Sequence, residues 1–292
     1  MDFTSLSLCQ PLLDALEEIG YISPTPIQAQ AIPDLIEGRD MLGCAQTGTG
    51  KTAAFALPIL NAMAKDPQVG RRRIRALMMC PTRELASQIH DNIEQYARHL
   101  DIRSMAMFGG VSQRPQEKIL RRGVDILVAT PGRLLDLISQ GYVDLSYVQF
   151  LVLDEADRML DMGFIRDIRK ILAQIPKKRQ SLLFSATIPH SIVELSRDML
   201  YNPASVSITP ESTTVEAIEQ SLMFVMRSDK RGLLTYIIEE ESPDKVLVFS
   251  RTKHGCNRIV KQLGQDGIEA LAIHGNKSQG AREKALRRFR NG

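Results

Sequence analysis

Seven short apolar runs alternate with amphipathic segments over the first 208 residues, and this alternation limits the possible folds more than any other feature. The runs lie at 40–45, 74–82, 104–110, 124–132, 148–157, 180–187 and 204–208. Their apolar residues are continuous rather than alternating, which is typical of strands buried on both faces. Amphipathic stretches such as 84–100 and 165–175 separate them. The pattern predicts an α/β fold, a doubly wound parallel sheet with helices on both faces.

A polar segment separates this series from a second, shorter one. Residues 209–217 read TPESTTVEA, which predicts a linker. Three more strand-like runs follow, at 218–226, 245–250 and 269–275. A helix is expected over 279–290. We therefore expect a complete domain at 1–208 and part of a second doubly wound domain at 218–292.

The composition is that of a folded globular protein. Hydrophobic residues make up 43% of the chain and charged residues 24%, which excludes collagen-like, coiled-coil and disordered chains. The sequence has no run of about 18 apolar residues and no secretory signal, so we expect a cytoplasmic protein without a membrane partner. The net charge of +3 is uneven, since 218–292 holds 14 Lys and Arg against 9 Asp and Glu. That excess is compatible with nucleic acid, and equally with an ordinary solvated surface.

A glycine-rich segment lies between a strand-like run and a helical one. It matches the phosphate-loop pattern Gly-x-x-x-x-Gly-Lys-Ser/Thr, with Ala45 in place of the first glycine. Backbone N–H groups of such a turn can bind phosphate oxygens, Lys51 can reach the terminal phosphates, and the Thr52 hydroxyl can ligate Mg²⁺. The sequence therefore predicts a nucleoside triphosphate site made by Ala45, Gln46, Thr47, Gly48, Thr49, Gly50, Lys51 and Thr52.

An acidic segment, residues 154–157, follows the apolar run 151–153. We expect Asp154 to hold Mg²⁺ through water and Glu155 to polarise the water that attacks the γ-phosphate. Acidic residues after a strand are also common at helix N-termini, where the helix dipole favours them. The phosphate loop favours the nucleotide interpretation. The histidines and cysteines have no metal-ligand spacing, so this Mg²⁺ is the metal that we expect.

The order of these and other motifs resembles that of the DEAD-box RNA helicases. Asp154-Glu155-Ala156-Asp157 is the signature of that family, and GYISPTPIQ at 20–28 is similar to its Q motif. Further matches are PTRELA at 81–86, Gly109-Gly110, TPGR at 130–133, SAT at 185–187, LVFSRT at 247–252 and QGAR at 279–282. The resemblance covers nearly the whole chain and implies two RecA-like lobes of the P-loop NTPase type. HGNKSQGAR at 274–282 is most similar to the bacterial RhlE-type subgroup.

The resemblance implies that the nucleotide is ATP, bound with Mg²⁺. Gln28 would pair with N6 and N7 of adenine, and Tyr21 would stack on the base. Without the resemblance, both residues would be assigned to a turn before a helix. The residues implied in catalysis are Lys51, Thr52, Asp154, Glu155 and Asp157. Thr52 and Asp154 are implied in Mg²⁺ binding.

The resemblance also implies sequence-nonspecific contacts with the RNA backbone. The residues concerned are Arg83, Gly109, Gly110, Thr130, Gly132, Arg133 and Arg282. Turn glycines and surface arginines are the alternative interpretation. Ser185 and Thr187 would couple Asp157 to RNA binding, although small hydroxyl residues after a strand also cap helices.

We therefore expect an ATP-dependent RNA helicase with an RNA-stimulated ATPase. Two alternatives stay open, a DNA helicase and an RNA-binding module gated by ATP without turnover. The strings Arg-Gly-x-Asp and His-Arg-x-Gly-Arg, which supply the family's arginine fingers, do not occur in 1–292. Turnover and unwinding by this chain are therefore expected to be impaired. For the subgroup, factors of ribosome assembly or RNA decay are the expected protein partners.

Overall fold

The computed structural model describes residues 2–208 and 218–292. The chain divides into two compact units, Met1–Glu211 and Ser212–Gly292. The predicted linker at 209–217 lies outside the described residues.

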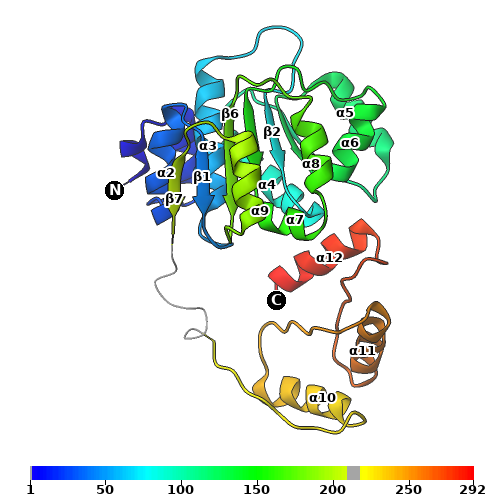
Figure 1. The fold of residues 1–292 in the computed structure, drawn as a ribbon. Helices are drawn as coiled ribbons and strands as arrows, with labels where there is room; N and C mark the ends of the chain where they lie inside the picture. The colour runs from blue at the N-terminus through cyan, green and yellow to red at the C-terminus, as the bar shows by residue number, and fades with distance from the viewer. Residues whose placement is uncertain (1, 209–217) are drawn as a thin grey trace. The chain divides into compact units, whose positions relative to one another are not determined.

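The first unit is built on one parallel sheet of seven strands (Figure 1). The strands are β1 (Met41–Cys44), β2 (Ala76–Met79), β3 (Ser104–Met107), β4 (Ile126–Ala129), β5 (Phe150–Leu153), β6 (Gln180–Ser185) and β7 (Ala204–Ser207). Their order across the sheet is β3-β4-β2-β5-β6-β1-β7, and every neighbouring pair is parallel. Each strand lies inside one of the seven apolar runs. The predicted α/β class and the doubly wound parallel sheet are confirmed.

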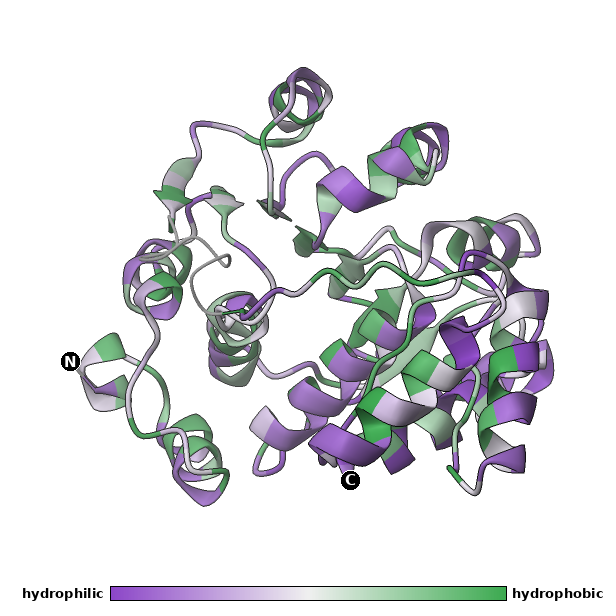
Figure 2. Cartoon of the chain, turned by 90° about the horizontal axis from the view of Figure 1, so that it is seen from below, coloured by the Kyte–Doolittle hydropathy of each residue, from purple (hydrophilic) through white to green (hydrophobic). Residues whose placement is uncertain are grey.

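Helices cover both faces of this sheet. They are the short 3₁₀ helix η1 (Phe3–Leu6), α1 (Gln10–Glu18), α2 (Pro26–Ile36), α3 (Lys51–Lys65), α4 (Arg83–Tyr96), α5 (Gln113–Arg122), α6 (Pro131–Ser139), α7 (Ala156–Asp161), α8 (Ile165–Leu172) and α9 (His190–Met199). One core cluster joins the sheet to α1–α4, and a second joins it to α6–α9. Successive strand residues point to opposite faces, so Met78 belongs to the first cluster and its neighbour Leu77 to the second. Figure 2 accordingly shows both hydrophobic and hydrophilic residues on the helices around the sheet.

The strand order decides where the predicted motifs meet. Because all strands are parallel, their carboxyl ends lie at one edge of the sheet, where α/β proteins bind ligands. The phosphate loop, the acidic segment 154–157 and the segment 185–187 follow β1, β5 and β6, which are neighbours in the sheet. The RNA-contact candidates of the first unit follow β2, β4 and β3, which form the other half. The edge therefore holds two adjoining groups of candidate residues.

The second unit differs from its sequence-based prediction. It contains α10 (Lys230–Glu241), α11 (Lys253–Gln265) and α12 (Gln279–Arg290), and the last confirms the predicted helix. The described residues of this unit include no strand, so the strands predicted at 218–226, 245–250 and 269–275 are wrong for this structure (Figure 1). A strand needs a hydrogen-bonded neighbour, and these runs form no ladder with one another. Their large side chains stay in water, as in Phe224 and Phe249.

Within the part of the chain that the structure describes, no helix has both the length and the apolar character of a membrane span.

Candidate functional site

The phosphate loop connects the end of β1 to the first residue of α3. Gly50 is the N-cap of that helix, with a φ of 92° that a side chain would strain. The Lys51 side chain turns back into the loop, where its Nζ donates a hydrogen bond of 2.9 Å to the Ala45 carbonyl. The loop residues 46–48 are exposed, so their backbone is open to a ligand. A glycine turn that leads into a helix N-terminus favours an anion such as a phosphate group.

Asp154, at the end of β5, lies directly behind this loop. Its Oδ1 is 3.9 Å from the Lys51 Nζ, and both side chains are buried. Burial raises the pKa of Asp154 to about 6; Lys51 opposes that rise, and the negative charge of Glu155 adds to it. An ionised carboxylate with so little solvation is stabilised by a nearby cation.

The donor set fits Mg²⁺, which prefers oxygen ligands. Asp154 offers a carboxylate, and Thr52 offers a hydroxyl in the first turn of α3. Among the described residues, no three His, Cys, Asp or Glu side chains are grouped so as to hold a metal ion by themselves. The remaining ligands would have to be water and the phosphate oxygens of a nucleotide, which is how Mg²⁺ usually binds at phosphate-transfer sites.

Glu155 and Asp157 extend the site from Asp154 toward β6. The backbone of Glu155 is left-handed, with φ 52° and ψ 50°, a conformation that costs on the order of 1–3 kcal/mol for a residue other than glycine. Asp157 Oδ2 accepts hydrogen bonds from the Thr187 N–H at 2.9 Å and the Thr187 Oγ1 at 2.8 Å. The Asp157 N–H in turn donates to the Ser185 Oγ at 3.3 Å.

These contacts bring together three residues for which the resemblance implied coupling. Partial burial raises the pKa of Asp157, but the hydrogen bonds from Thr187, the Arg158 N–H and Ser185 outweigh it and hold that pKa below its ordinary value. The N-cap of the following helix α9 is Pro189, so neither Ser185 nor Thr187 caps it. Asp157 is therefore held as a carboxylate that links the end of β6 to α7.

Gln28, in the first turn of α2, is also attached to the phosphate loop. Its Oε1 accepts a 2.9 Å hydrogen bond from the Thr25 N–H, and its Nε2 donates a 3.0 Å hydrogen bond to the Gly50 carbonyl. The side chain is buried. Gln28 thus stabilises the start of α2, as expected without the resemblance, and it also contacts the phosphate loop. Its contact with adenine stays a prediction.

Tyr21 lies in an aromatic cluster. Its ring is stacked on that of Phe3, with 6.4 Å between the centroids, and its hydroxyl is 3.3 Å from the hydroxyl of Tyr96. Tyr96 is fully buried on α4, whereas Tyr21 is 39% exposed and has ring surface available to a base. Sequence reasoning missed Tyr96, because no local pattern links it to a residue that lies 75 positions earlier.

The RNA-contact candidates of the first unit meet around the loop after β3. A Cβ on Gly110 would lie 2.1 Å from Arg83 Nη1, so the Arg83 guanidinium occupies the space that the glycine leaves. Arg133 Nη2 donates a 3.5 Å hydrogen bond to the Val111 carbonyl, and Arg133 Nε is 3.5 Å from Asp136 Oδ2. The side chains of Arg83, on α4, and Arg133, on α6, thus both contact the loop after β3.

The other candidates differ in exposure and position. Gly109 is half-buried in the same loop, Thr130 is buried at the end of β4, and Gly132 is exposed in the first turn of α6. Arg282, by contrast, belongs to α12 of the second unit. Sequence reasoning missed Gln116, which also contacts the loop after β3.

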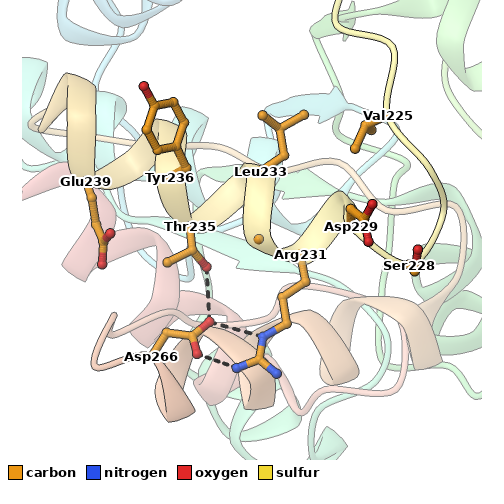
Figure 3. Close-up of a pocket in the computed structure, with 10 residues that line it drawn as sticks. Val225, Ser228, Asp229, Arg231, Leu233, Thr235, Tyr236, Glu239 and Asp266 are labelled. Carbon is orange, nitrogen blue, oxygen red and sulfur yellow. Dashed lines mark hydrogen bonds and ion pairs between the residues drawn. The ribbon is translucent and has the colours of Figure 1, made fainter.

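The second unit contains a cavity of about 670 Å³ beside α10 (Figure 3). Two of the charged residues that line it, Arg231 and Asp266, are bonded to each other. Arg231 Nε donates to Asp266 Oδ2 at 3.1 Å, Arg231 Nη2 pairs with the other carboxylate oxygen, and Thr235 Oγ1 donates to Asp266 Oδ2 at 3.0 Å. None of the predicted site residues lines this cavity, so the sheet edge is the better candidate site.

Two known family models match this chain. Residues 25–195 match the model of the DEAD/DEAH box helicase family, and residues 229–292 match that of the helicase conserved C-terminal domain.

Similar proteins extend over the whole chain. The chain is 43% identical over 291 residues to the ATP-dependent RNA helicase DeaD of Klebsiella pneumoniae, which covers 99% of this chain and 45% of that protein. It is 39% identical over 292 residues to the ATP-dependent RNA helicase RhlB of Pseudoalteromonas atlantica, covering 99% of this chain and 69% of that protein. The DEAD-box ATP-dependent RNA helicase CshA of Streptococcus pneumoniae is 39% identical over 292 residues, with 100% of this chain and 55% of that protein covered. The chain thus spans about half the length of most of these relatives.

Proposed function

The chain belongs to the DEAD/DEAH box helicase family, and from this we propose that it binds ATP with Mg²⁺ and couples ATP binding and hydrolysis to the separation or remodelling of RNA duplexes. The observation that carries the proposal is that two groups of candidate residues adjoin at the carboxyl edge of one sheet. The nucleotide motifs follow β1, β5 and β6, and the RNA-contact candidates of the first unit follow β2, β4 and β3. The subgroup of RhlE type stays a prediction.

The nucleotide half of the sheet edge can catalyse phosphoryl transfer by positioning the reacting groups and by stabilising the charge of the phosphates. The N–H groups of the loop hold the phosphates, and Lys51 exchanges its bond with the Ala45 carbonyl for a phosphate oxygen. Asp154 and Thr52 would hold Mg²⁺, which neutralises phosphate charge when it is bound. Glu155 orients the water that attacks the γ-phosphate, a step that depends mainly on geometry.

The RNA half can bind a nucleic-acid backbone. Arg83 and Arg133 carry forked donors that suit phosphate groups, and the loop with Gly109 and Gly110 allows close approach. Asp157 with Ser185 and Thr187 is the bridge between the ends of β5 and β6 through which we propose that nucleotide state affects RNA binding. The names of the relatives favour RNA over DNA. We further propose that the protein acts in the cytoplasm, with ribosome-assembly or RNA-decay factors as partners.

The nucleotide half is tested by titration with a fluorescent ATP analogue. Lys51→Ala should weaken ATP binding about 10-fold or more, because a charged hydrogen bond is worth roughly 1.5–3 kcal/mol. Glu155→Gln should bind ATP normally and lose hydrolysis. Lys65→Ala, at the opposite and exposed end of α3, is the matched control and should bind as the wild type. Equal ATP affinity in Lys51→Ala and the wild type would refute the assignment.

The choice of nucleotide and nucleic acid is tested on the same proteins. ATP should compete better than GTP, because guanine presents O6 where adenine presents an N6 donor and a polar group left unpaired costs about 1–3 kcal/mol. Gln28→Ala should reduce that preference. Hydrolysis should be stimulated more by single-stranded RNA than by single-stranded DNA. Stronger stimulation by DNA would favour the DNA helicase alternative. RNA binding that responds to ATP, without hydrolysis in a single turnover, would favour the gated binding module.

A further inference from the structure

Helix α5 is unusual because the one residue that it buries is polar. That residue is Gln116, which is 6% exposed, whereas the apolar residues of α5 stay half-buried or exposed. Burying an amide is unfavourable unless its polar atoms are hydrogen-bonded. The partners of Gln116 therefore indicate what the side chain does.

The side-chain hydrogen bonds of Gln116 all go to the two ends of one loop, residues 108–112. Its Oε1 accepts from the Phe108 N–H at 3.3 Å, and its Nε2 donates to the Phe108 carbonyl at 3.3 Å and to the Ser112 carbonyl at 3.4 Å. Phe108 directly follows β3, which is the edge strand of the sheet and pairs only with β4. Gln116 thus satisfies both backbone groups of Phe108, as a neighbouring strand would, and ties Phe108 to Ser112.

This loop carries the glycine pair between the two arginines that we assign to RNA. Gly110 has a φ of 74° and lies under the Arg83 guanidinium, and Arg133 bonds the Val111 carbonyl. Side chains from the starts of α4 and α6 and from the middle of α5 therefore hold the same five residues. Arg83 is half-buried and can still contact a ligand, whereas Gln116 lies beneath the loop and cannot.

We propose that Gln116 is a positioning residue that sets the conformation of loop 108–112 and, through it, the affinity for RNA. The inference rests on the proposed RNA function of this loop. An apolar side chain of similar length would fill the space but leave the backbone groups of Phe108 and the Ser112 carbonyl without this partner. The loop would then sample other conformations, and Gly110 would no longer be held under Arg83.

The test compares Gln116→Met with Gln113→Met. Gln113 lies one turn earlier on α5, and its amide bonds only the side chains of Glu117 and Gln140. Fluorescence anisotropy with single-stranded RNA at fixed salt should show about 10-fold weaker binding for Gln116→Met, the effect of roughly one lost hydrogen bond. ATP affinity should change less than about twofold in both variants, and RNA affinity should be unchanged in Gln113→Met. Gln116→Glu keeps an acceptor for the Phe108 N–H but sets a buried carboxylate oxygen against the Phe108 and Ser112 carbonyls, so it should bind RNA no better than Gln116→Met.

Hydrogen exchange and the variant Arg83→Ala separate the possible outcomes. The Phe108 amide should exchange faster in Gln116→Met, while the amides of β4 keep their protection. RNA affinity that is unchanged in Gln116→Met but reduced in Arg83→Ala would overturn the inference alone. If neither variant changed RNA affinity, the proposed RNA face would fail and the inference with it. A parallel loss of ATP affinity, RNA affinity and stability would show that Gln116 is only structural, and would also overturn it.

Discussion

The two units carry the same kind of apolar run, but only the first turns such runs into a sheet. In the run 180–187 the side chain of Phe184 is completely buried, whereas in the similar run 245–250 the side chain of Phe249 is 88% exposed. Both runs are short, and in both the apolar residues end in a phenylalanine followed by a serine, Ser185 and Ser250. The difference teaches that such a run specifies a capacity to form a strand, and that its partners decide whether the strand forms.

The partners in the first unit come from far along the chain. Residue Met41 of β1 pairs with Leu182 on one side and with Ala204 on the other. Without β6 and β7, the run at 40–45 would have no ladder, although its own sequence would be unchanged. The three runs of the second unit show that situation, since among the described residues none of them pairs with another strand.

The largest expected effect is on stability. Phe184→Ala should destabilise the chain by about 3–5 kcal/mol, because it leaves a cavity beside Phe55, whose ring centroid lies 5.5 Å away. Phe249→Ala should change stability by less than about 0.5 kcal/mol, as is usual for an exposed position. Urea unfolding followed by circular dichroism measures both variants. A similar loss in the two would break the comparison, because it would show that residues 245–250 are packed in solution.

A second effect contrasts two carboxylates with opposite pKa shifts. The pKa of Asp154 is raised to about 6, so Asp154 takes up a proton as the pH falls through 6 and loses the charge that attracts a cation. Affinity for ATP with Mg²⁺ should then fall about 10-fold between pH 7 and pH 5, beyond the change due to the nucleotide itself. In the second unit, Arg231 lowers the pKa of Asp266, so that carboxylate stays ionised over this range.

Matched substitutions separate these contributions in ATP titrations at several pH values. Asp154→Asn should bind more weakly at pH 7 and keep only the pH dependence of the nucleotide. Asp266→Asn should follow the wild-type curve. A wild-type curve no steeper than that of Asp154→Asn would show that Asp154 does not titrate in this range.

The smallest effect concerns the two tyrosine hydroxyls of the first unit. A double-mutant cycle with Tyr21→Phe and Tyr96→Phe should give a coupling energy of about 0.5–1.5 kcal/mol in urea unfolding, because the hydroxyls are each other's partners 3.3 Å apart. Tyr96→Phe should also weaken ATP binding slightly if Tyr21 stacks on the base. Tyr236→Phe, at an exposed position of the second unit, is the control and should have no measurable effect. Additive effects of the two substitutions would show that the hydroxyls do not interact in solution.

The central strands of the first unit could be predicted because parallel strands buried on both faces require continuous apolar residues, as in 126–129. The phosphate loop could be predicted because its chemistry lies within eight consecutive residues. Neither reason applies to Gln116, since a glutamine in a polar helix has no local sign of burial. The role of Tyr96 could not be predicted either, because only its hydroxyl contact with Tyr21 distinguishes it from an ordinary core aromatic residue.

The sequence by itself therefore determined what depends on neighbouring residues, namely the helices, the strand-forming runs of the first unit and the chemical types at each motif. Only the tertiary structure decided which motifs touch. Lys51 lies beside Asp154, Gln28 bonds the Gly50 carbonyl, and Thr187 bonds Asp157, although each pair is separated in sequence. The contacts of Lys51 and Thr187 depend on the strand order β5-β6-β1 within the sheet, and that of Gln28 depends on the packing of α2 against α3. That order is set by long-range hydrogen bonding and packing between strands, which no local pattern of residues encodes.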